Sequence, residues 1–259
     1  VKLEQRLVLL AWLNSLFGYD QNRDLLTDVR EAAEGFDASG RSYVYLRLTA
    51  RGDKVRIGAA DLVRYDDNIR EHLQAMNARR PEPVTLRYFQ HLAALYTEVF
   101  LDAYFNRRGQ LLRDLNAFVE TRNAGKSAGD IKDGKFAESD LKKLAFWMAT
   151  GSGKTLIMHL NYRQFLHYNN LPLDNILLIT PNEGLSEQHI AEMTASGIPC
   201  RRFDINESGL GLFDKNAVRV IEITKLVEEK RGGGVSVSVE SFEGNNLIFV
   251  DEGHKGSGG

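Results

Sequence analysis

Cysteine is almost absent from this chain, and long apolar runs and an excess of charge are missing. The single cysteine, Cys200, excludes an internal disulfide framework and any metal site built from several cysteines, so we expect a reducing compartment, the cytoplasm, and a structural role for this thiol. No apolar run approaches the roughly 18 residues that span a bilayer, so no membrane partner is expected. A formal net charge of −2 gives no overall electrostatic case for nucleic acid, so any such contact must be local.

The chain has enough apolar content to bury a core, because 43% of its 259 residues are hydrophobic. Residues 1–34 carry leucines at helical spacing and predict two helices. Residues 41–57 alternate apolar and polar side chains around a glycine and predict a β-hairpin. Its tyrosine and arginine face could stack on nucleic acid, although a half-exposed antiparallel sheet explains the same pattern. Residues 1–80 are therefore expected to be an accessory, mostly helical α+β region of unknown role.

Two prolines, Pro81 and Pro83, mark the expected start of a second domain, 81–259. The pattern before them predicts a helix over residues 61–76, and the pattern after them predicts helices over 85–106 and 110–121. Residues 122–138 are polar and rich in Gly, Lys and Asp, so we expect an exposed, mobile insertion there.

Beyond residue 142 the sequence has α/β character. Apolar runs without alternation are typical of strands buried on both faces of a parallel sheet, and here they alternate with helical segments. The predicted strands are 143–148, 175–180, 201–205, 218–223 and 247–250, and the predicted helices are 155–168 and 184–195. The expected fold class is therefore α/β, with a RecA-like nucleotide-binding domain at its centre.

The stretch FWMATGSGKTL, residues 146–156, has the layout of a phosphate-binding loop between a strand and a helix. Glycines allow a tight turn whose N–H groups point at one anion, and the helix adds the positive end of its dipole. An ordinary glycine-rich turn would lack these flanks. Met148 stands where the usual motif opens with glycine, so the loop must accommodate a side chain there. The predicted nucleotide contacts are Thr150, Gly151, Ser152, Gly153, Lys154 and Thr155.

A second motif, LIFVDEGH, places two acids at the end of an apolar strand. ATP hydrolysis needs a carboxylate for Mg²⁺ and a group that orients or deprotonates water. Asp251 and the Thr155 hydroxyl are the predicted magnesium ligands, and Glu252 is the predicted base, so Lys154, Asp251 and Glu252 form the candidate catalytic set. Adjacent acids after a strand are common, but the pairing with the loop at Lys154 makes the motif specific.

These motifs together resemble superfamily 2 helicases and translocases. MATGSGKTLIMH, LLITPNEGLSEQH and FVDEGHKGSGG are most similar to the helicase-type subunit of type III restriction enzymes, over roughly residues 143–259. The resemblance implies an ATP- and Mg²⁺-dependent motor that acts on DNA in a restriction or defence system. It also implies a methyltransferase or nuclease subunit as a partner.

Further residue roles come from the same resemblance. It implies nucleic-acid phosphate contacts at Thr180, Pro181, Asn182 and Thr224, and a coupling role for His254 between the nucleotide and nucleic-acid sites. His189 lies in the same block, where helix packing or solvent exposure explains it equally well.

An adenine contact is implied at Gln90. Leu86-Arg87-Tyr88-Phe89-Gln90 is similar to a short signature that precedes the phosphate loop in this family, although its tyrosine is displaced and it lies farther from Gly151 than usual.

Two classes of function fit these motifs. The first is an ATP-driven helicase or translocase, and the second is a nucleotide-gated DNA-binding or scaffold module with little turnover. A small-molecule kinase would not need the acids or the TPNEGL block. Because no second RecA-like domain and no nuclease signature follow His254, we expect a fragment of a longer protein that hydrolyses ATP poorly by itself.

Overall fold

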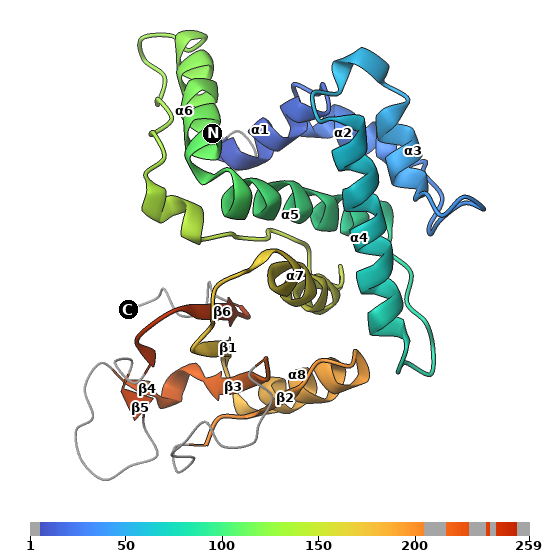
Figure 1. Ribbon diagram of the computed structural model, residues 1–259. Coiled ribbons are helices and arrows are strands. Elements are labelled where there is room, and N and C mark those ends of the chain that lie inside the picture. The colour runs from blue at the N-terminus through green and yellow to red at the C-terminus, as the bar shows by residue number, and fades with distance from the viewer. Residues whose placement is uncertain (1–5, 205–215, 228–236, 239–241, 253–259) are drawn as a thin grey trace. The chain divides into compact units, whose positions relative to one another are not determined.

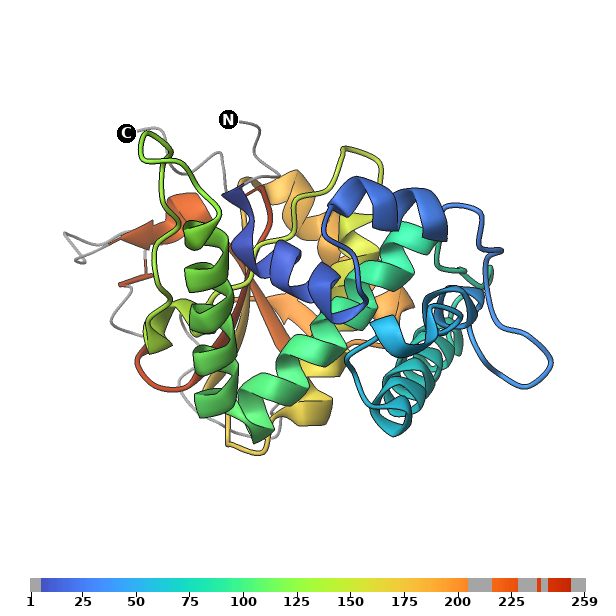
Figure 2. The same cartoon turned by 90° about the horizontal axis from the view of Figure 1, so that it is seen from above.

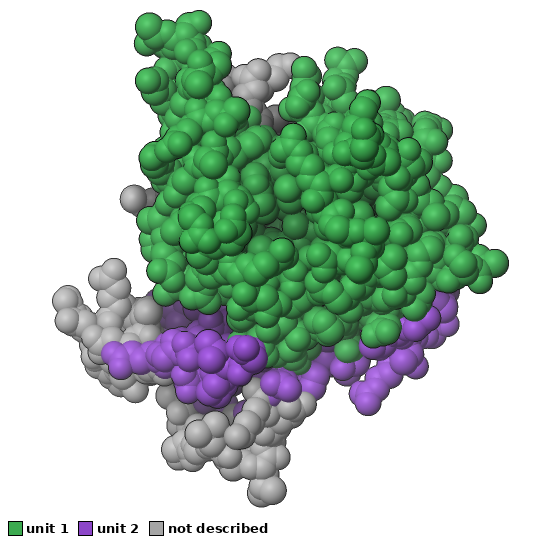
Figure 3. Space-filling model, turned by 45° about the horizontal axis from the view of Figure 1, so that its top comes forward, with its two compact units in different colours: residues 1–73, 84–169 green, residues 74–83, 170–259 purple. Residues whose placement is uncertain are grey.

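The computed structural model describes residues 6–204, 216–227, 237–238 and 242–252 (Figure 1). The chain forms two compact units, which Figure 3 distinguishes by colour. Unit 1 comprises residues 1–73 and 84–169, and unit 2 comprises residues 74–83 and 170–259. The expected functional division at residue 80 stays a prediction, because compact units and functional domains need not share a boundary.

Unit 1 is built from helices around α5 (Tyr88–Asn106), whose residues are buried almost without a break from Gln90 to Ala103. A helix that is apolar on all sides belongs in a core, and α5 packs against both α6 and α7 (Figures 1 and 2). The remaining helices are α1 (Val8–Leu16), α2 (Asn22–Val29), α3 (Tyr43–Thr49), α4 (Ala59–Asn77, whose last turn belongs to unit 2), α6 (Arg108–Ala124) and α7 (Lys154–Tyr168).

The hairpin predicted for residues 41–57 is wrong, because α3 occupies this stretch. The Ser42 hydroxyl accepts a hydrogen bond from the Tyr45 amide at 2.9 Å and caps the helix. Val44 and Leu48, four residues apart, are buried on one side, whereas Leu46 between them is 38% exposed. The helical period of the apolar residues therefore outweighed their local alternation.

The predicted insertion after α6 is mostly exposed, and two asparagines of α6 attach it to that helix. Asn123 donates to the Asp133 carbonyl at 2.9 Å and accepts from the Asp133 amide at 2.8 Å. Asn116 makes the same reciprocal pair with Phe136, at 3.1 and 2.8 Å. Each asparagine side chain thus satisfies both backbone polar groups of one loop residue, as a neighbouring strand would in a sheet.

Unit 2 is organised by a parallel four-stranded sheet of order β2-β3-β1-β6. The central strand β1 buries Ile176, Leu177 and Leu178, as a strand covered on both faces should. The bounds are β1 (Asn175–Thr180), β2 (Cys200–Arg202), β3 (Val218–Glu222) and β6 (Asn246–Val250), with helix α8 (Glu183–Ala195) between β1 and β2 and a second small parallel pair of β4 (Leu226–Val227) and β5 (Val237–Ser238).

The two edges where strands begin and end differ in character. At the amino edge, the backbone amide of Asp174 donates to the Asn245 carbonyl and the backbone amide of Asn245 donates to the Asp174 carboxylate, both at 2.8 Å. The side-chain amide of Asn175 donates to the side-chain oxygen of Asn246 at 2.7 Å. At the carboxyl edge, β1 ends at Thr180 beside Glu222 of β3. The carboxyl edge therefore collects the residues that follow each strand.

The strand predicted for residues 143–148 does not form among the described residues. Leu144, Phe146 and Trp147 are 37%, 38% and 77% exposed. An apolar run specifies a preference for burial but no partner, and a strand exists only when its backbone groups are paired. This part of the predicted sheet is wrong, whereas the strands over 175–180, 218–223 and 247–250 are confirmed to within one residue.

Candidate functional site

The glycine-rich turn before α7 has the backbone of an anion-binding loop. Gly151 and Gly153 have φ angles of +75° and +82°, in the left-handed region that glycine enters without strain. The Ser152 amide and hydroxyl both donate to the Ala149 carbonyl, at 3.2 and 2.6 Å, and close the turn. Gly153 is the N-cap of α7, so the turn leads directly into the positive end of a helix of 15 residues.

Gln90 fixes this turn from the start of α5. Its Nε2 donates to the Ser152 carbonyl at 2.9 Å, and its Oε1 accepts from the Arg87 amide at 2.9 Å. A Cβ atom on Gly153 would come too close to Gln90 Nε2, so the Gln90 side chain would have to move to make room for any other residue. The predicted adenine contact of Gln90 stays a prediction, because the described residues engage both ends of its amide.

The side chains at the start of α7 suit a phosphate group and its magnesium ion. Lys154 and Thr155 are half-buried, and within the described residues the Lys154 amine and the Thr155 hydroxyl have no hydrogen-bond or ion-pair partner. Apart from its chain neighbours, no atom of the described residues lies within 4 Å of the position that a Cβ of Gly151 would take. A cation, a hydroxyl, open space and a helix N-terminus at one turn fit a nucleotide phosphate.

In unit 2 the predicted acids follow β6. The Asp251 amide donates to the Ile179 carbonyl at 3.0 Å and continues the ladder between β6 and β1. Glu252 has a φ of +53°, the left-handed region that a glutamate enters only at a cost in free energy. Both residues are half-buried, and His254 lies outside the described residues.

One residue on α8 contacts the predicted metal ligand. His189 Nε2 lies 3.0 Å from Asp251 Oδ2, and the two side chains are 4% and 15% exposed. The sequence left His189 open between a role in the nucleic-acid-binding block and a bland one, helix packing or solvent exposure. Only the fold, which places α8 beside the end of β6, separates these alternatives, and no spacing rule in the sequence would have found the pair.

The predicted nucleic-acid contacts lie at the carboxyl edge of the same sheet. Thr180 is 1% exposed, and its hydroxyl is bonded to Ser186 Oγ at 2.6 Å. The Asn182 side chain caps α8 by accepting from the Leu185 amide at 3.0 Å. Thr224 is exposed in a 3₁₀ turn after β3, and Pro181 follows β1. Backbone groups at this edge are therefore better placed for phosphate contacts than the Thr180 hydroxyl.

Carboxylates surround the cations at this edge. Arg202 contacts Glu183 at 3.0 Å, Glu187 at 3.1 Å and Glu222 at 3.6 Å. Lys225 is paired with Glu222 at 2.9 Å. The local field is close to neutral, which agrees with the charge balance of the whole chain.

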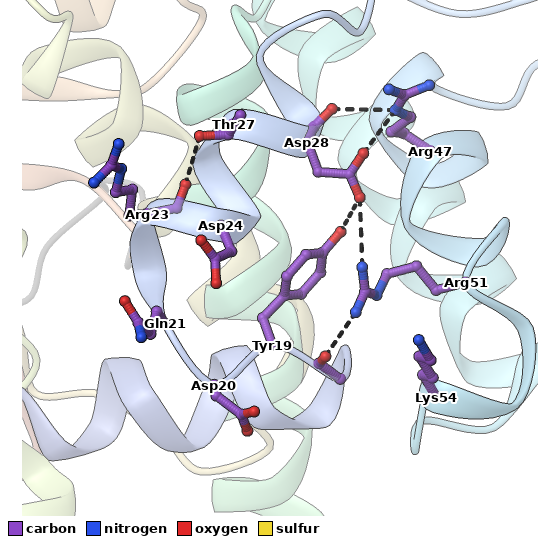
Figure 4. A pocket seen from close by; sticks show the side chains of 11 residues that line it. Tyr19, Asp20, Gln21, Arg23, Asp24, Thr27, Asp28, Arg47, Arg51 and Lys54 are labelled. Atoms are coloured by element: carbon purple, nitrogen blue, oxygen red, sulfur yellow. Dashed lines mark hydrogen bonds and ion pairs between the residues drawn. The ribbon is translucent and has the colours of Figure 1, made fainter.

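A hollow of the described surface lies elsewhere in unit 1. It has a volume of about 960 Å³ and is lined by residues of α2, of α3 and of the segments that follow α1 and α3, including four cations and three aspartates (Figure 4). Asp28 accepts from the Tyr19 hydroxyl and lies 3.0 Å from Arg47 and 3.7 Å from Arg51. Because the charges are mixed and partly paired with one another, the hollow selects no class of ligand.

The structure thus assembles the predicted residues in two groups. The phosphate-loop residues and Gln90 lie together in unit 1, and Thr180, Thr224, Asp251 and Glu252 lie along one sheet edge in unit 2. The predicted magnesium ligands Thr155 and Asp251 belong to different units. Within the described ranges, no three His, Cys, Asp or Glu side chains are grouped as metal ligands, and no helix is long and apolar enough to cross a membrane.

Comparison with known proteins identifies the family. The model of the type III restriction enzyme, res subunit, matches residues 103–259, which is more than half of the chain and reaches upstream of the motif-bearing part. Searches of curated proteins and of solved structures found no match. The matched range contains the phosphate loop, the carboxyl edge of the sheet and the two acids, and its RecA-like fold agrees with the parallel sheet of unit 2. The chain therefore belongs to the family of the type III restriction enzyme res subunit.

Proposed function

We propose that this chain is the ATP-binding part of a DNA helicase or translocase motor, in which ATP hydrolysis is coupled to DNA binding. The observation that carries the proposal is the turn at Gly151–Gly153, because it presents Lys154 at a helix N-terminus with space for an anion. Family membership supports the same activity. In this proposal residues 81–259 are the first RecA-like domain, and residues 1–80 are an accessory region.

The phosphate-loop residues bind and orient the nucleotide. The backbone amides of residues 150–153 and the dipole of α7 attract the phosphates, and the Lys154 ammonium neutralises the β- and γ-phosphates. Thr155 offers its hydroxyl to the metal ion. Gln90 holds the turn in this conformation through Ser152, at 2.9 Å.

The acids after β6 carry the hydrolytic step. Asp251 would hold Mg²⁺, and Glu252 would orient a water molecule and accept its proton as the water oxygen bonds to the γ-phosphorus. When bound, ATP would supply the phosphoanhydride bond that breaks, with ADP as the leaving group, and Mg²⁺ would supply positive charge that offsets the charge of the phosphates.

DNA is the proposed second ligand. Thr180, Pro181, Asn182 and Thr224 would contact its phosphates at the carboxyl edge, where such contacts position a strand without reading its bases. His254 would couple the two sites. A methyltransferase or nuclease subunit is the proposed partner, since the family belongs to restriction systems.

ATP turnover by the full-length protein, with and without duplex or single-stranded DNA, tests this function. DNA should raise turnover, and Lys154→Ala should abolish it by weakening phosphate binding. Glu252→Gln should lower turnover by roughly 100-fold or more while ATP still binds, since a positioned base contributes about 10²–10⁴-fold. If ATP binds but turnover is absent or indifferent to DNA, the site is instead a nucleotide-dependent gate on a binding module.

A further inference from the structure

The buried face of α8 contacts the ends of two strands. Ser186 bonds the Thr180 hydroxyl at the end of β1, and His189 contacts Asp251 directly after β6. Both side chains belong to the set of α8 residues that are buried, together with Met193. One helix therefore contacts the last residue of β1 and the first residue after β6.

The chemistry of the His189 ring sets the direction of its contact with Asp251. An ionised carboxylate only accepts hydrogen bonds, so the proton lies on Nε2, which donates to Oδ2. The other ring nitrogen, Nδ1, is buried and has no hydrogen-bond partner among the described residues. An apolar side chain would fill this place without leaving a polar atom unsatisfied. Packing alone therefore does not account for a histidine here.

We propose that His189 is a positioning residue for Asp251. Its hydrogen bond at Oδ2 fixes the plane and rotamer of the carboxylate, so that the remaining acceptor sites of the carboxylate point in one direction. Residues that orient a metal ligand in this way raise metal affinity or activity by about 10–100-fold. The inference rests on the proposed function, in which Asp251 serves the magnesium ion.

Two substitutions separate the hydrogen bond from the packing. His189→Leu removes the donor and keeps most of the buried volume, whereas His189→Gln keeps an amide N–H at a similar reach. His91→Leu is the matched control, because His91 also pairs with a buried aspartate, Asp66, at 3.4 Å, but in unit 1.

The first measurement is the Mg²⁺ concentration that gives half-maximal ATP turnover by the full-length protein. We expect His189→Leu to raise it about 10-fold or more, with turnover recovering at high Mg²⁺, and His189→Gln to stay within about 3-fold of wild type. Binding of a fluorescent ATP analogue without Mg²⁺ should be unchanged. The control variant should lose thermal stability without any shift in Mg²⁺ dependence.

A second measurement needs no activity. In a thermal double-mutant cycle of His189→Leu and Asp251→Ala, the double variant should melt no lower than the worse single variant, because each change removes one partner of the same interaction. Additive losses would overturn the contact, and an unchanged Mg²⁺ dependence in His189→Leu would overturn the positioning role alone. A wild-type protein without Mg²⁺-dependent turnover would overturn the proposed function and the positioning role together, even with a non-additive cycle.

Discussion

At the residue scale, position 153 has to satisfy two independent requirements. Its φ of +82° lies where a Cβ atom strains the backbone, and the same Cβ would come too close to Gln90 Nε2. Gly151 has a similar φ of +75° but open space around it. The two glycines of one loop are therefore needed for different reasons, one for its conformation alone and the other also for the close approach of α5.

Alanine at these two positions should separate the requirements. Gly151→Ala should destabilise the protein by about 1–2 kcal/mol, the cost of a left-handed alanine. Gly153→Ala should lower the melting temperature further and should weaken ATP binding more, because the Gln90 side chain must also move. Thermal melts and ATP titrations of both variants provide the comparison. Equal losses would show that the contact with Gln90 contributes nothing.

The residues of this loop could be predicted because their chemistry follows from local spacing. Glycines, Lys154 and Thr155 stand in consecutive positions, and the turn needs no distant residue to be recognised. The pairing of His189 with Asp251 could not be predicted in this way, since 62 positions separate them and only the packing of α8 joins them. The hydrogen bond of Gln90 to the Ser152 carbonyl depends in the same way on the packing of α5.

At the scale of elements, a buried polar cluster joins helices α4, α5 and α7. Glu98 of α5 is fully buried and accepts from Asn68 at 2.9 Å and from Gln164 at 2.8 Å. Burial raises the pKa of Glu98 above its usual value, although these hydrogen bonds oppose the shift. His72 lies 4.0 Å from Glu98, and burial, with the nearby charges of His167 and Arg163, lowers the pKa of His72 to about 4. The helix that begins at Lys154 is thus held at its other end by groups that titrate.

The His72 shift predicts a loss of stability in mild acid. A histidine kept neutral in the folded state makes unfolding easier once the unfolded chain binds its proton, so stability falls as the pH drops from 6.5 towards 4. The loss attributable to His72 should approach roughly 3 kcal/mol at pH 4. The His72→Gln variant carries no titrating group at this position, so it should not show this loss of stability. The difference between wild-type and variant melting temperatures, followed from pH 7 to pH 4, is the measurement, and a constant difference would contradict the prediction.

Elements with a strong period and a fixed partner were predicted best. The strand over residues 175–180 agrees with β1 at both ends, since its apolar residues are buried on both faces. The predicted hairpin at 41–57 was wrong because a capped helix also buries Val44 and Leu48. The predicted strand at 143–148 was wrong because an apolar run does not specify which strand would pair with it. A short local pattern therefore determines the type of an element reliably only where the fold supplies the partner that the pattern needs.

At the scale of the whole molecule, charge limits how DNA can be held. The net charge is −2, and the described cations Arg202 and Lys225 beside the proposed contacts are paired with glutamates. The four proposed contact residues carry no charge. Binding should therefore depend on backbone groups and hydroxyls more than on the release of counterions.

Salt dependence tests this expectation. The logarithm of the DNA-binding constant should fall with the logarithm of salt concentration with a slope of about −1 to −3, because each neutralised phosphate contributes about −0.9. Glu187→Gln removes one of the carboxylates around Arg202. It should therefore tighten DNA binding and make the slope more negative by about 0.9, the contribution of one neutralised phosphate. Fluorescence anisotropy across a salt series measures both quantities. A wild-type slope near −6 would show that cations elsewhere dominate.

In the parallel sheet of unit 2, residues that join the strands and the predicted site residues lie at opposite edges. At the amino edge, the reciprocal bonds of Asp174 with Asn245 and the pair of Asn175 with Asn246 join β1 to β6, and none of the predicted site residues lies there. At the carboxyl edge, His189, Asp251 and Glu252 gather where a glutamate adopts a costly backbone conformation. Changes at the first edge would affect the abundance of the folded protein, and changes at the second would affect its chemistry. The two edges can therefore diverge at independent rates, so that one scaffold can acquire a new activity without losing its fold.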